Sequence, residues 1–319
     1  MKVLDTPILF LIFNRPDTTV QVLQEIRKAA PSRLYIACDG ARKHKEREKE
    51  KVQETRDLVL KNIDWECDIK TLFRDNNLGC KEAVSNAITW FFENEEMGII
   101  LEDDCLPSQS FFPFCEELLI KYKEDTRIWL IGGTNFLSKF HLENSNKYFF
   151  SKYDRSWGWA SWRRAWKNYD KKLTLWPEIK NTNILKNILY SDKEAKMYNH
   201  IFEQTYQGNI DTWDYQWLFT VLINNGLSII PETNLISNIG FGGEATHTFD
   251  GEHPYANLNR GEVLFPLEHP NAIIPDFKKD IRYSQLSVKE QETRLQAFFS
   301  MLCKGEFRKI ITKIHKHLK

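Results

Sequence analysis

The segment Met97-Gly-Ile-Ile-Leu-Glu-Asp-Asp-Cys105 joins a short apolar run to three consecutive acids. A continuous apolar run is typical of a central strand in a parallel sheet, buried on both faces. Ligands of open α/β sheets bind at the carboxyl ends of the strands, where Glu102, Asp103 and Asp104 would lie. Carboxylate oxygens suit Mg²⁺ or Mn²⁺, which often bind substrate phosphates as well. The segment therefore predicts a divalent-metal site for a phosphorylated substrate. An acidic loop, or a cap for a helix over 108–123, is the alternative.

Strands and helices alternate through the first 135 residues. Besides the apolar run, we expect strands over 7–13, 33–39, 67–74 and 127–131, and helices over 16–28, within 42–60, over 81–93 and over 111–123. This alternation predicts an α/β fold with a mostly parallel central sheet flanked by helices. Beyond residue 135 it stops, and we expect strands over 147–153 and 227–231 with helical segments over 171–206 and up to Leu222.

Composition narrows the class of protein. The 319 residues are 42% hydrophobic, which is enough for a large core. Basic and acidic residues balance at 44 each, so a nucleic-acid partner is not expected. The six cysteines show no metal-ligand spacing, and neither a signal-peptide profile nor a long apolar run is present. We therefore expect a cytoplasmic protein with reduced thiols.

Polar residues stand at the ends of the other predicted strands. The chain has no GxGxxG and no GxxxxGK[ST] motif, so dinucleotide dehydrogenases and P-loop ATPases are not expected. Arg15 could pair with a phosphate or with the three acids. Asp39 could accept a hydrogen bond from a base, and the segment 74–79 could contribute as well. Asp-Gly and Asn-Leu-Gly are also ordinary turn sequences, so both interpretations remain.

Tryptophans gather in the second half. Trp159, Trp162 and Trp166 recur at helical spacing, which indicates core packing, and we favour that role for Trp162 and Trp166. Trp157 and Trp159 flank Gly158, where the backbone can approach a ligand, so we expect them to line a sugar pocket.

Two further segments carry candidate functional residues. Asp211 or Asp214 is either a helix N-cap or, beside tryptophan, a general base. The glycine-rich loop 238–247 could cradle phosphate or close over a substrate. Its His247 is a candidate metal or phosphate contact, or an ordinary surface histidine.

The tail over 285–319 is expected to be an amphipathic helix. Its end sets four apolar residues against a basic face: Phe307, Ile310, Ile311 and Ile314. Such a helix can lie on an anionic membrane surface, and packing on its own domain is the alternative.

In order, these motifs resemble the glycosyltransferase A fold, and within it the N-acetylglucosaminyltransferase I-like group. The matching segments are Phe13–Asp17, Asp39, Leu101–Asp104, Gly158-Trp159, Trp213-Asp214 and Phe241-Gly242 through to Thr246-His247. The chain lacks the membrane anchor and stem of a Golgi enzyme, so it looks like a soluble bacterial relative. The resemblance implies a Rossmann-like donor half over 1–137, a Trp-rich acceptor half over 138–276 of the same domain, and a helical tail over 277–319.

The resemblance also implies roles for individual residues. Asp104 would bind Mn²⁺ or Mg²⁺, Glu102 would reach the ribose, and Asp103 would support the donor site. The predicted donor-binding set is Asn14, Arg15, Asp39, Asn77, Gly79, Glu102, Asp103, Gly242 and Gly243, with Asp39 on uracil. The predicted acceptor pocket is Asn135, Trp157, Trp159 and Trp213, and His247 is a second candidate metal ligand.

Asp214 would be the catalytic base. The gap from Asp214 to Trp217 is longer here than in the family pattern, which keeps Asp211 as the reserve. The implied activity is inverting, metal-dependent transfer from a nucleotide-diphosphate sugar, expected to be a UDP-sugar, to a hydroxyl of a glycan, glycolipid or glycoprotein. Bacterial surface polysaccharide synthesis, in the cytoplasm or at the inner face of the membrane, is the expected setting.

Two other functions fit parts of the sequence. A sugar-nucleotide nucleotidyltransferase shares a related core, but it usually has a glycine-rich, basic loop after the first strand, where this chain has Asn14-Arg-Pro-Asp17. A non-catalytic sugar- or nucleotide-binding protein is the other alternative. The acid triplet and the Trp-flanked Asp214 weigh against it.

Overall fold

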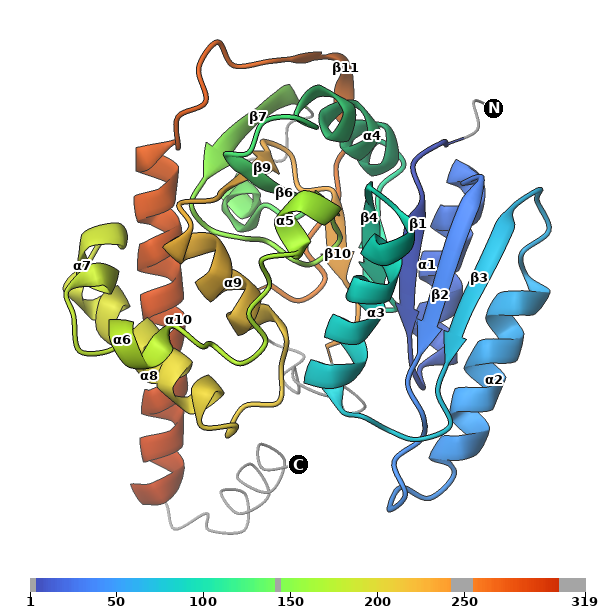
Figure 1. Ribbon diagram of the computed structural model, residues 1–319, viewed down its shortest axis with the longest axis horizontal. Helices are drawn as coiled ribbons and strands as arrows, with labels where there is room; N and C mark the ends of the chain where they lie inside the picture. The colour runs from blue at the N-terminus through green and yellow to red at the C-terminus, as the bar shows by residue number, and fades with distance from the viewer. Residues whose placement is uncertain (1–3, 141–144, 242–254, 304–319) are drawn as a thin grey trace.

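The computed structural model describes residues 4–140, 145–241 and 255–303, which form an α/β fold around one large sheet (Figure 1). The strand order is β11-β7-β9-β6-β8-β4-β1-β2-β3, and β10 pairs separately with β5. The strands are β1 (Ile8–Ile12), β2 (Arg33–Cys38), β3 (Asp68–Phe73), β4 (Met97–Glu102), β5 (Cys105–Pro107), β6 (Ile128–Gly132), β7 (Ser145–Ser151), β8 (Trp159–Trp162), β9 (Leu227–Pro231), β10 (Ile236–Asn238) and β11 (Val263–Glu268).

Helices cover both faces of this sheet. They are α1 (Pro16–Ala29), α2 (Glu48–Lys61), α3 (Cys80–Asn94), α4 (Phe111–Lys121), α5 (Arg163–Trp166), α6 (Trp176–Ile179), α7 (Ile184–Ile188), α8 (Asp192–Tyr206), α9 (Asp214–Ile223) and α10 (Phe277–Cys303), with the 3-10 turn η1 (Phe136–Phe140). The predicted mostly parallel sheet flanked by helices is therefore confirmed.

Strand β1 lies between β2 and β4 and is parallel to both. Ile8, Phe10 and Ile12 face the core shared with α1, α2 and α4. Leu9 and Leu11 face the opposite core, shared with α3, α5 and α9. Apolar residues on both faces explain why this strand and β4 have continuous apolar sequences.

Strand β8 runs antiparallel between β4 and β6, and it corrects one sequence interpretation. The spacing of Trp159, Trp162 and Trp166 suggested a helix, but the first two lie on opposite faces of a strand. The short helix α5 then returns Trp166 to the side of Trp159. The predicted core positions of Trp162 and Trp166 are confirmed, since their side chains are buried.

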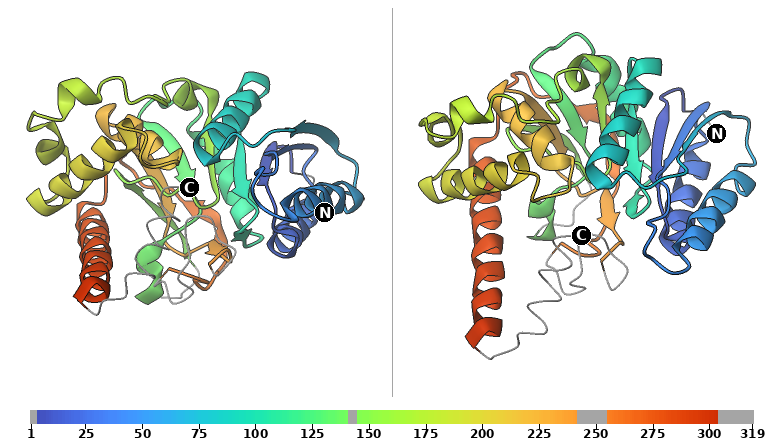
Figure 2. Two further views of the ribbon diagram at one scale, coloured as in Figure 1. Left: turned by 90° about the horizontal axis from the view of Figure 1, so that it is seen from below. Right: turned by 60° about the horizontal axis from the view of Figure 1, so that its bottom comes forward.

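The second half differs from the sequence expectation in its details. The region expected to be helical over 171–206 contains three separate helices, α6, α7 and α8, and β10 and β11 follow the strand expected to be the last. Figure 2 shows α6 to α8 and α10 together at the end of the molecule remote from β3.

Helix α10 begins at Phe277 rather than at Gln285. Its buried Tyr283 donates a hydrogen bond to Asn135 Oδ1 at 2.8 Å. Its buried Asp280 accepts one from the Ser151 hydroxyl at 2.6 Å. The basic end of the tail, with Phe307, Ile310, Ile311 and Ile314, lies outside the described residues. In the described part of the chain, none of the helices combines the length and hydropathy needed to span a bilayer.

Candidate active site

The three acids lie where β1 and β4 end side by side. Leu11 pairs with Glu102 in the register of these parallel strands, so the residues after each strand leave the sheet together. The backbone N–H of Phe13 donates to Asp103 Oδ2 at 3.0 Å and ties the two segments together. The sequence prediction that the acids lie at the carboxyl edge of a central strand is confirmed.

Arg15 is the cation beside these acids. It caps the start of α1, and its Nη1 lies 3.1 Å from Asp104 Oδ2. The side chains of Arg15 and Asp104 are 19% and 12% exposed, so water screens this ion pair only in part. Of the two interpretations that the sequence left open for Arg15, the structure shows the contact with the acids.

The segment after β10 completes this cluster from a distant part of the chain. Ile239 N donates to the Asp104 carbonyl at 2.9 Å, and Arg15 Nη1 lies 3.4 Å from the Gly240 carbonyl. A Cβ at Gly240 would collide with the Asp104 carboxylate and lie 2.5 Å from Arg15 Nη1. The sequence marked this glycine as part of a loop, whereas the structure requires it for close approach to the ion pair.

The acid triplet has more negative charge than Arg15 can balance. Burial and repulsion from Asp104, Asp103 and Asp214 raise the pKa of Glu102 to about 8. Burial also raises the pKa of Asp103 to about 6, although Arg15 opposes that shift. A divalent cation would relieve both effects, and carboxylate oxygens are the ligands that Mg²⁺ and Mn²⁺ prefer. The carboxylate oxygens of this site are therefore suitable ligands for the predicted divalent cation.

The protein alone does not supply a full coordination shell within the described ranges. Among those residues, no group of three histidine, cysteine or acidic side chains is close enough to hold a metal ion. A cation at Asp104 would therefore need ligands from a substrate, as Mg²⁺ commonly does with phosphates. His247, the second candidate ligand, and Gly242 and Gly243 lie outside the described residues.

Asp39 binds the loop that follows β3. Its carboxylate accepts hydrogen bonds from Asn77 Nδ2 at 2.9 Å, Leu78 N at 2.9 Å and Gly79 N at 3.2 Å. Asn77 also donates to the Gly40 carbonyl at 2.8 Å. The described structure thus gives Asp39 and Asn77 a role in ordering this loop, and their contact with a nucleotide stays a prediction.

Asn14 belongs to a polar cluster that the sequence did not indicate. Its Nδ2 donates to Glu48 Oε1 at 2.8 Å, and Glu48 also forms an ion pair with Arg42. The Arg42 guanidinium lies 5.5 Å from the centre of the Phe13 ring. The sequence predicted only a helix within 42–60, which gave no indication that Arg42 and Glu48 lie beside the residues that follow β1.

The two candidate bases have different surroundings. The Asp211 carboxylate accepts from Cys80 N and Lys81 N, both at 3.1 Å, and so caps α3. Gly79 makes this possible: its φ is +83°, and a Cβ there would lie 2.7 Å from Asp211. Both Asp211 oxygens are thus engaged by the backbone of α3, and not by the helix that follows Asp211 in the sequence, whose N-cap it was predicted to be.

Asp214 is the first residue of α9. Its Oδ1 accepts from Tyr215 N at 3.0 Å and from the Thr212 hydroxyl. Its charge contributes to the raised pKa of Glu102, so it lies within electrostatic reach of the acid triplet. Of the two candidates, Asp214 retains a carboxylate oxygen without a hydrogen-bond donor among the described residues.

Asp154 is an acid that sequence reasoning missed. It follows β7, and burial, with a smaller contribution from Asp214, raises its pKa to about 7, against the opposing charge of Arg155. In the sequence, the one feature that could indicate Asp154 is its position after a predicted strand and just before Trp157.

The predicted acceptor pocket needs correction at three of its four residues. Trp159 is 0% exposed and Trp213 3% exposed, and their rings stack 5.7 Å apart inside the core. Asn135 is also buried, and its side chain is saturated by bonds to Leu137 N, Tyr283, and the Pro231 and Glu232 carbonyls. These three side chains therefore have no surface for a sugar.

Trp157 is the remaining candidate for that pocket. It is partly exposed, and its ring contacts those of Phe136 at 5.2 Å and Phe241 at 5.7 Å. Phe241 directly follows Gly240, so this aromatic group is continuous with the segment that covers Asp104.

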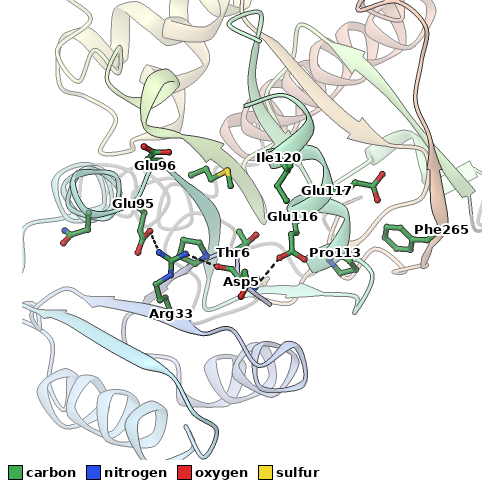
Figure 3. Close-up of a pocket in the computed structure, with 13 residues that line it drawn as sticks. Asp5, Thr6, Arg33, Glu95, Glu96, Pro113, Glu116, Glu117, Ile120 and Phe265 are labelled. Carbon is green, nitrogen blue, oxygen red and sulfur yellow. Dashed lines mark hydrogen bonds and ion pairs between the residues drawn. The ribbon is translucent and has the colours of Figure 1, made fainter. Parts of the chain in front are cut away.

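A groove of about 710 Å³ lies at the amino ends of β1 and β4, opposite to the ends that carry the three acids (Figure 3). Glu95, one of the acids that line it, already has partners. Glu95 accepts from Tyr35 at 2.7 Å and from Arg33 at 2.8 Å, as the contact between Arg33 and Glu95 in Figure 3 shows. The groove does not contain any of the predicted site residues.

Comparisons with known proteins give only distant likenesses. No family model matches the chain, and no curated protein sequence matches it. HddC from Yersinia pseudotuberculosis is 10% identical, with 53% of this chain and 83% of that chain covered at a TM-score of 0.32. S. aureus TarS 1–349 is 8% identical, with 72% and 59% covered at 0.38. A UDP-glucose pyrophosphorylase complexed with UDP-glucose is 11% identical, with 46% and 62% covered at 0.25. What is established for this chain is an α/β fold with a carboxylate-rich site at the ends of β1 and β4.

Proposed function

We propose that this protein is a glycosyltransferase that uses a nucleotide-diphosphate sugar, specifically a UDP-sugar, and a divalent cation. The observation that carries the proposal is the excess of carboxylates at the end of β4. Glu102, Asp103 and Asp104 share one arginine, and a second acid, Asp214, lies within electrostatic reach. The ordered resemblance to the N-acetylglucosaminyltransferase I-like group supports the same activity.

Asp104 would hold Mn²⁺ or Mg²⁺ together with the donor's phosphates. When bound, the cation supplies charge neutralisation to the diphosphate leaving group. Asp103 is tied to Phe13 N and would support the donor site without facing the sugar. Glu102 is the acid closest to the sheet, and the resemblance assigns it to the ribose.

Asp214 would take the proton from the acceptor hydroxyl. An alcohol is a poor nucleophile at neutral pH, and a positioned base typically accelerates such a step by ~10²–10⁴-fold. Helix α9 fixes Asp214 through Tyr215 N, which leaves its other oxygen to accept that proton. One direct displacement opposite the leaving group would invert the anomeric carbon.

The acceptor would be a glycan, glycolipid or glycoprotein, in bacterial surface polysaccharide synthesis. Trp157, with Phe136 and Phe241, would supply the flat apolar surface that packs against a sugar ring. We place the protein in the cytoplasm, at the inner face of the membrane when its basic tail contacts anionic lipid.

The first test measures thermal unfolding with UDP, GDP, CDP and ADP, each with and without Mn²⁺. A ligand at one hundred times its Kd stabilises the folded state by about 2.7 kcal/mol. We expect a shift for UDP that needs Mn²⁺ and is lost in Asp104→Asn. No shift with any nucleotide would contradict the proposal.

The second test measures transfer from UDP-sugars and the anomeric configuration of the product by NMR. Asp214→Asn should retain the Mn²⁺-dependent UDP shift but lose at least about 100-fold in turnover. Asp192→Asn is the matched control, because Asp192 is the first residue of α8 as Asp214 is of α9, and it is exposed. Full activity in Asp214→Asn, or a retained configuration, would overturn the assigned mechanism. Release of pyrophosphate from a nucleoside triphosphate and a sugar phosphate would instead identify a nucleotidyltransferase.

A further inference from the structure

Arg15 lies directly on the group that the proposed cation would need. Its Nη1 is 3.1 Å from Asp104 Oδ2, while Asp104 Oδ1 receives only a weak contact from Cys105 Sγ at 3.5 Å. The guanidinium is thus the principal partner of the Asp104 side chain in the described structure. A cation binding to this carboxylate would add two positive charges next to the guanidinium, and like charges at such short range repel each other.

We propose that Arg15 is an internal counter-ion that competes with the divalent cation for Asp104 and, when the cation binds, moves onto the donor's diphosphate. This inference rests on the proposed function, since it requires that the site take a cation and a nucleoside diphosphate. It assigns Arg15 a positioning role that links the binding of the two ligands.

The backbone of Arg15 is fixed while its side chain can exchange partners. The Arg15 carbonyl accepts from Thr19 N at 3.0 Å, Thr19 Oγ1 at 2.6 Å and Thr18 Oγ1 at 3.3 Å, which anchors the start of α1. The guanidinium has one carboxylate contact and a longer one to the Gly240 carbonyl at 3.4 Å. Guanidinium groups bind phosphate oxygens in the same bidentate geometry as carboxylates, so a diphosphate beside Asp104 is a competent new partner.

Gly240 limits the space around the ion pair of Arg15 and Asp104. Because a side chain at Gly240 would collide with Asp104 and Arg15, the backbone of the segment after β10 lies directly against the pair. The guanidinium therefore cannot move closer to this segment, and it must turn away from Gly240 to leave Asp104.

A thermodynamic consequence follows from this competition. Cation alone must displace Arg15 without offering it a new anionic partner, so its binding is weakened. Nucleoside diphosphate supplies that partner, so each ligand strengthens the other by the same factor. We expect a coupling factor within the usual range for two linked sites, about 5- to 150-fold.

The test is Mn²⁺ binding measured by electron paramagnetic resonance, with and without UDP, in the wild type, Arg15→Ala and Arg15→Lys. Arg15→Ala should bind Mn²⁺ alone about tenfold more tightly than the wild type, and UDP should then tighten Mn²⁺ binding by a smaller factor than it does in the wild type, because only direct coordination by the phosphates remains. Arg15→Lys keeps the charge without the bidentate geometry and should retain weak binding of Mn²⁺ alone. Arg27→Ala is the control on the same helix, where Arg27 pairs with Asp64 at the surface and should leave both affinities unchanged.

The outcomes separate this inference from the proposed function. Mn²⁺-dependent UDP binding in the wild type, together with unchanged or weaker binding of Mn²⁺ alone in a folded Arg15→Ala protein, overturns the counter-ion role and leaves the transferase proposal standing. Loss of the Mn²⁺–UDP coupling in Arg27→Ala as well would also overturn it, because the effect would not be specific to Arg15. If no variant binds UDP or Mn²⁺, both proposals fall together.

Discussion

Strand β4 has acids at both ends, and the two groups of acids differ in how many positively charged partners they have. At the amino end, Glu95 is buried and accepts hydrogen bonds from Arg33 and Tyr35. Glu96 beside it forms an exposed ion pair with Lys123 at 2.9 Å. Each acid at this end has its own partner.

At the carboxyl end, three acids share the single guanidinium of Arg15. Glu102 has no hydrogen-bond donor among the described residues, and its pKa is raised to about 8. The groove lined by Glu95 and Glu96 lies at the amino end of β4, whereas the three acids that share Arg15 lie at its carboxyl end. Acids without a counter-ion of their own are the feature that marks the carboxyl end of β4 as the candidate ligand site.

The largest predicted difference between the two ends concerns Glu102. Its pKa in the folded protein lies above its ordinary value of 4.5, so the fold disfavours the charged form. The contribution of Glu102 to stability is therefore most favourable at low pH and becomes unfavourable as pH rises from about 4.5 to about 8. Glu102→Gln removes this cost, on the order of 3–5 kcal/mol at pH above 8. Urea unfolding in EDTA at pH 5 and pH 8.5 would measure it.

The critical outcome is whether Glu102→Gln raises or lowers the free energy of unfolding. We expect Glu102→Gln to be more stable than the wild type at pH 8.5 and close to it at pH 5. Adding Mn²⁺ with UDP should shrink the difference, because a bound cation favours the ionised carboxylate. A variant that is less stable than the wild type at pH 8.5 would mean that the Glu102 charge is already balanced.

Glu95 at the other end should behave in the opposite way. Glu95→Ala leaves the buried hydroxyl of Tyr35 without its acceptor and breaks the contact with Arg33, which is partly screened by solvent. We expect a loss of about 2 kcal/mol in the free energy of unfolding, with Mn²⁺-dependent UDP binding and the proposed transferase activity per folded molecule unchanged. Glu95→Gln keeps an acceptor for Tyr35 and should cost less. Loss of catalytic activity in either folded variant would contradict the assignment of a purely structural role to the amino end of β4.

Gly240 tests the packing over the carboxyl end. In Gly240→Ala the new methyl group collides with Asp104 and crowds Arg15, so the segment after β10 must shift. Overpacking of this kind typically costs about 1–3 kcal/mol. We expect a cost near the low end on thermal unfolding, because the segment can move outward, and a clear loss of Mn²⁺-dependent UDP binding. Unaltered nucleotide affinity would show that this segment does not shape the site.

The smallest effect is expected for Glu96. Its side chain is 69% exposed and that of Lys123 48% exposed, so solvent screens their ion pair. Glu96→Gln should leave both the free energy of unfolding and the proposed transferase activity without measurable change. A clear loss of stability would show that exposed pairs at the amino end contribute more than their geometry implies.

Much of the fold of the first 135 residues could be predicted from sequence alone. The strands β1, β2 and β4 and the helices α1 and α3 lie within a few residues of their predicted positions. Apolar runs and helix-start signals are local features, so they determine these elements before any long-range contact forms. The location of the acid triplet follows for the same reason, because it ends a strand that is apolar on both faces.

The tertiary structure decided which residues surround the acid triplet at the carboxyl end of β4. Strand β8 became a strand because it fits antiparallel between β4 and β6, which buries Trp159 and removes it from the predicted pocket. The capping role of Asp211 depends on α3, 130 residues earlier in the chain. Contacts between distant segments leave no periodic signal in the sequence, so only the folded chain shows which polar residues bind each other and which remain available for a ligand.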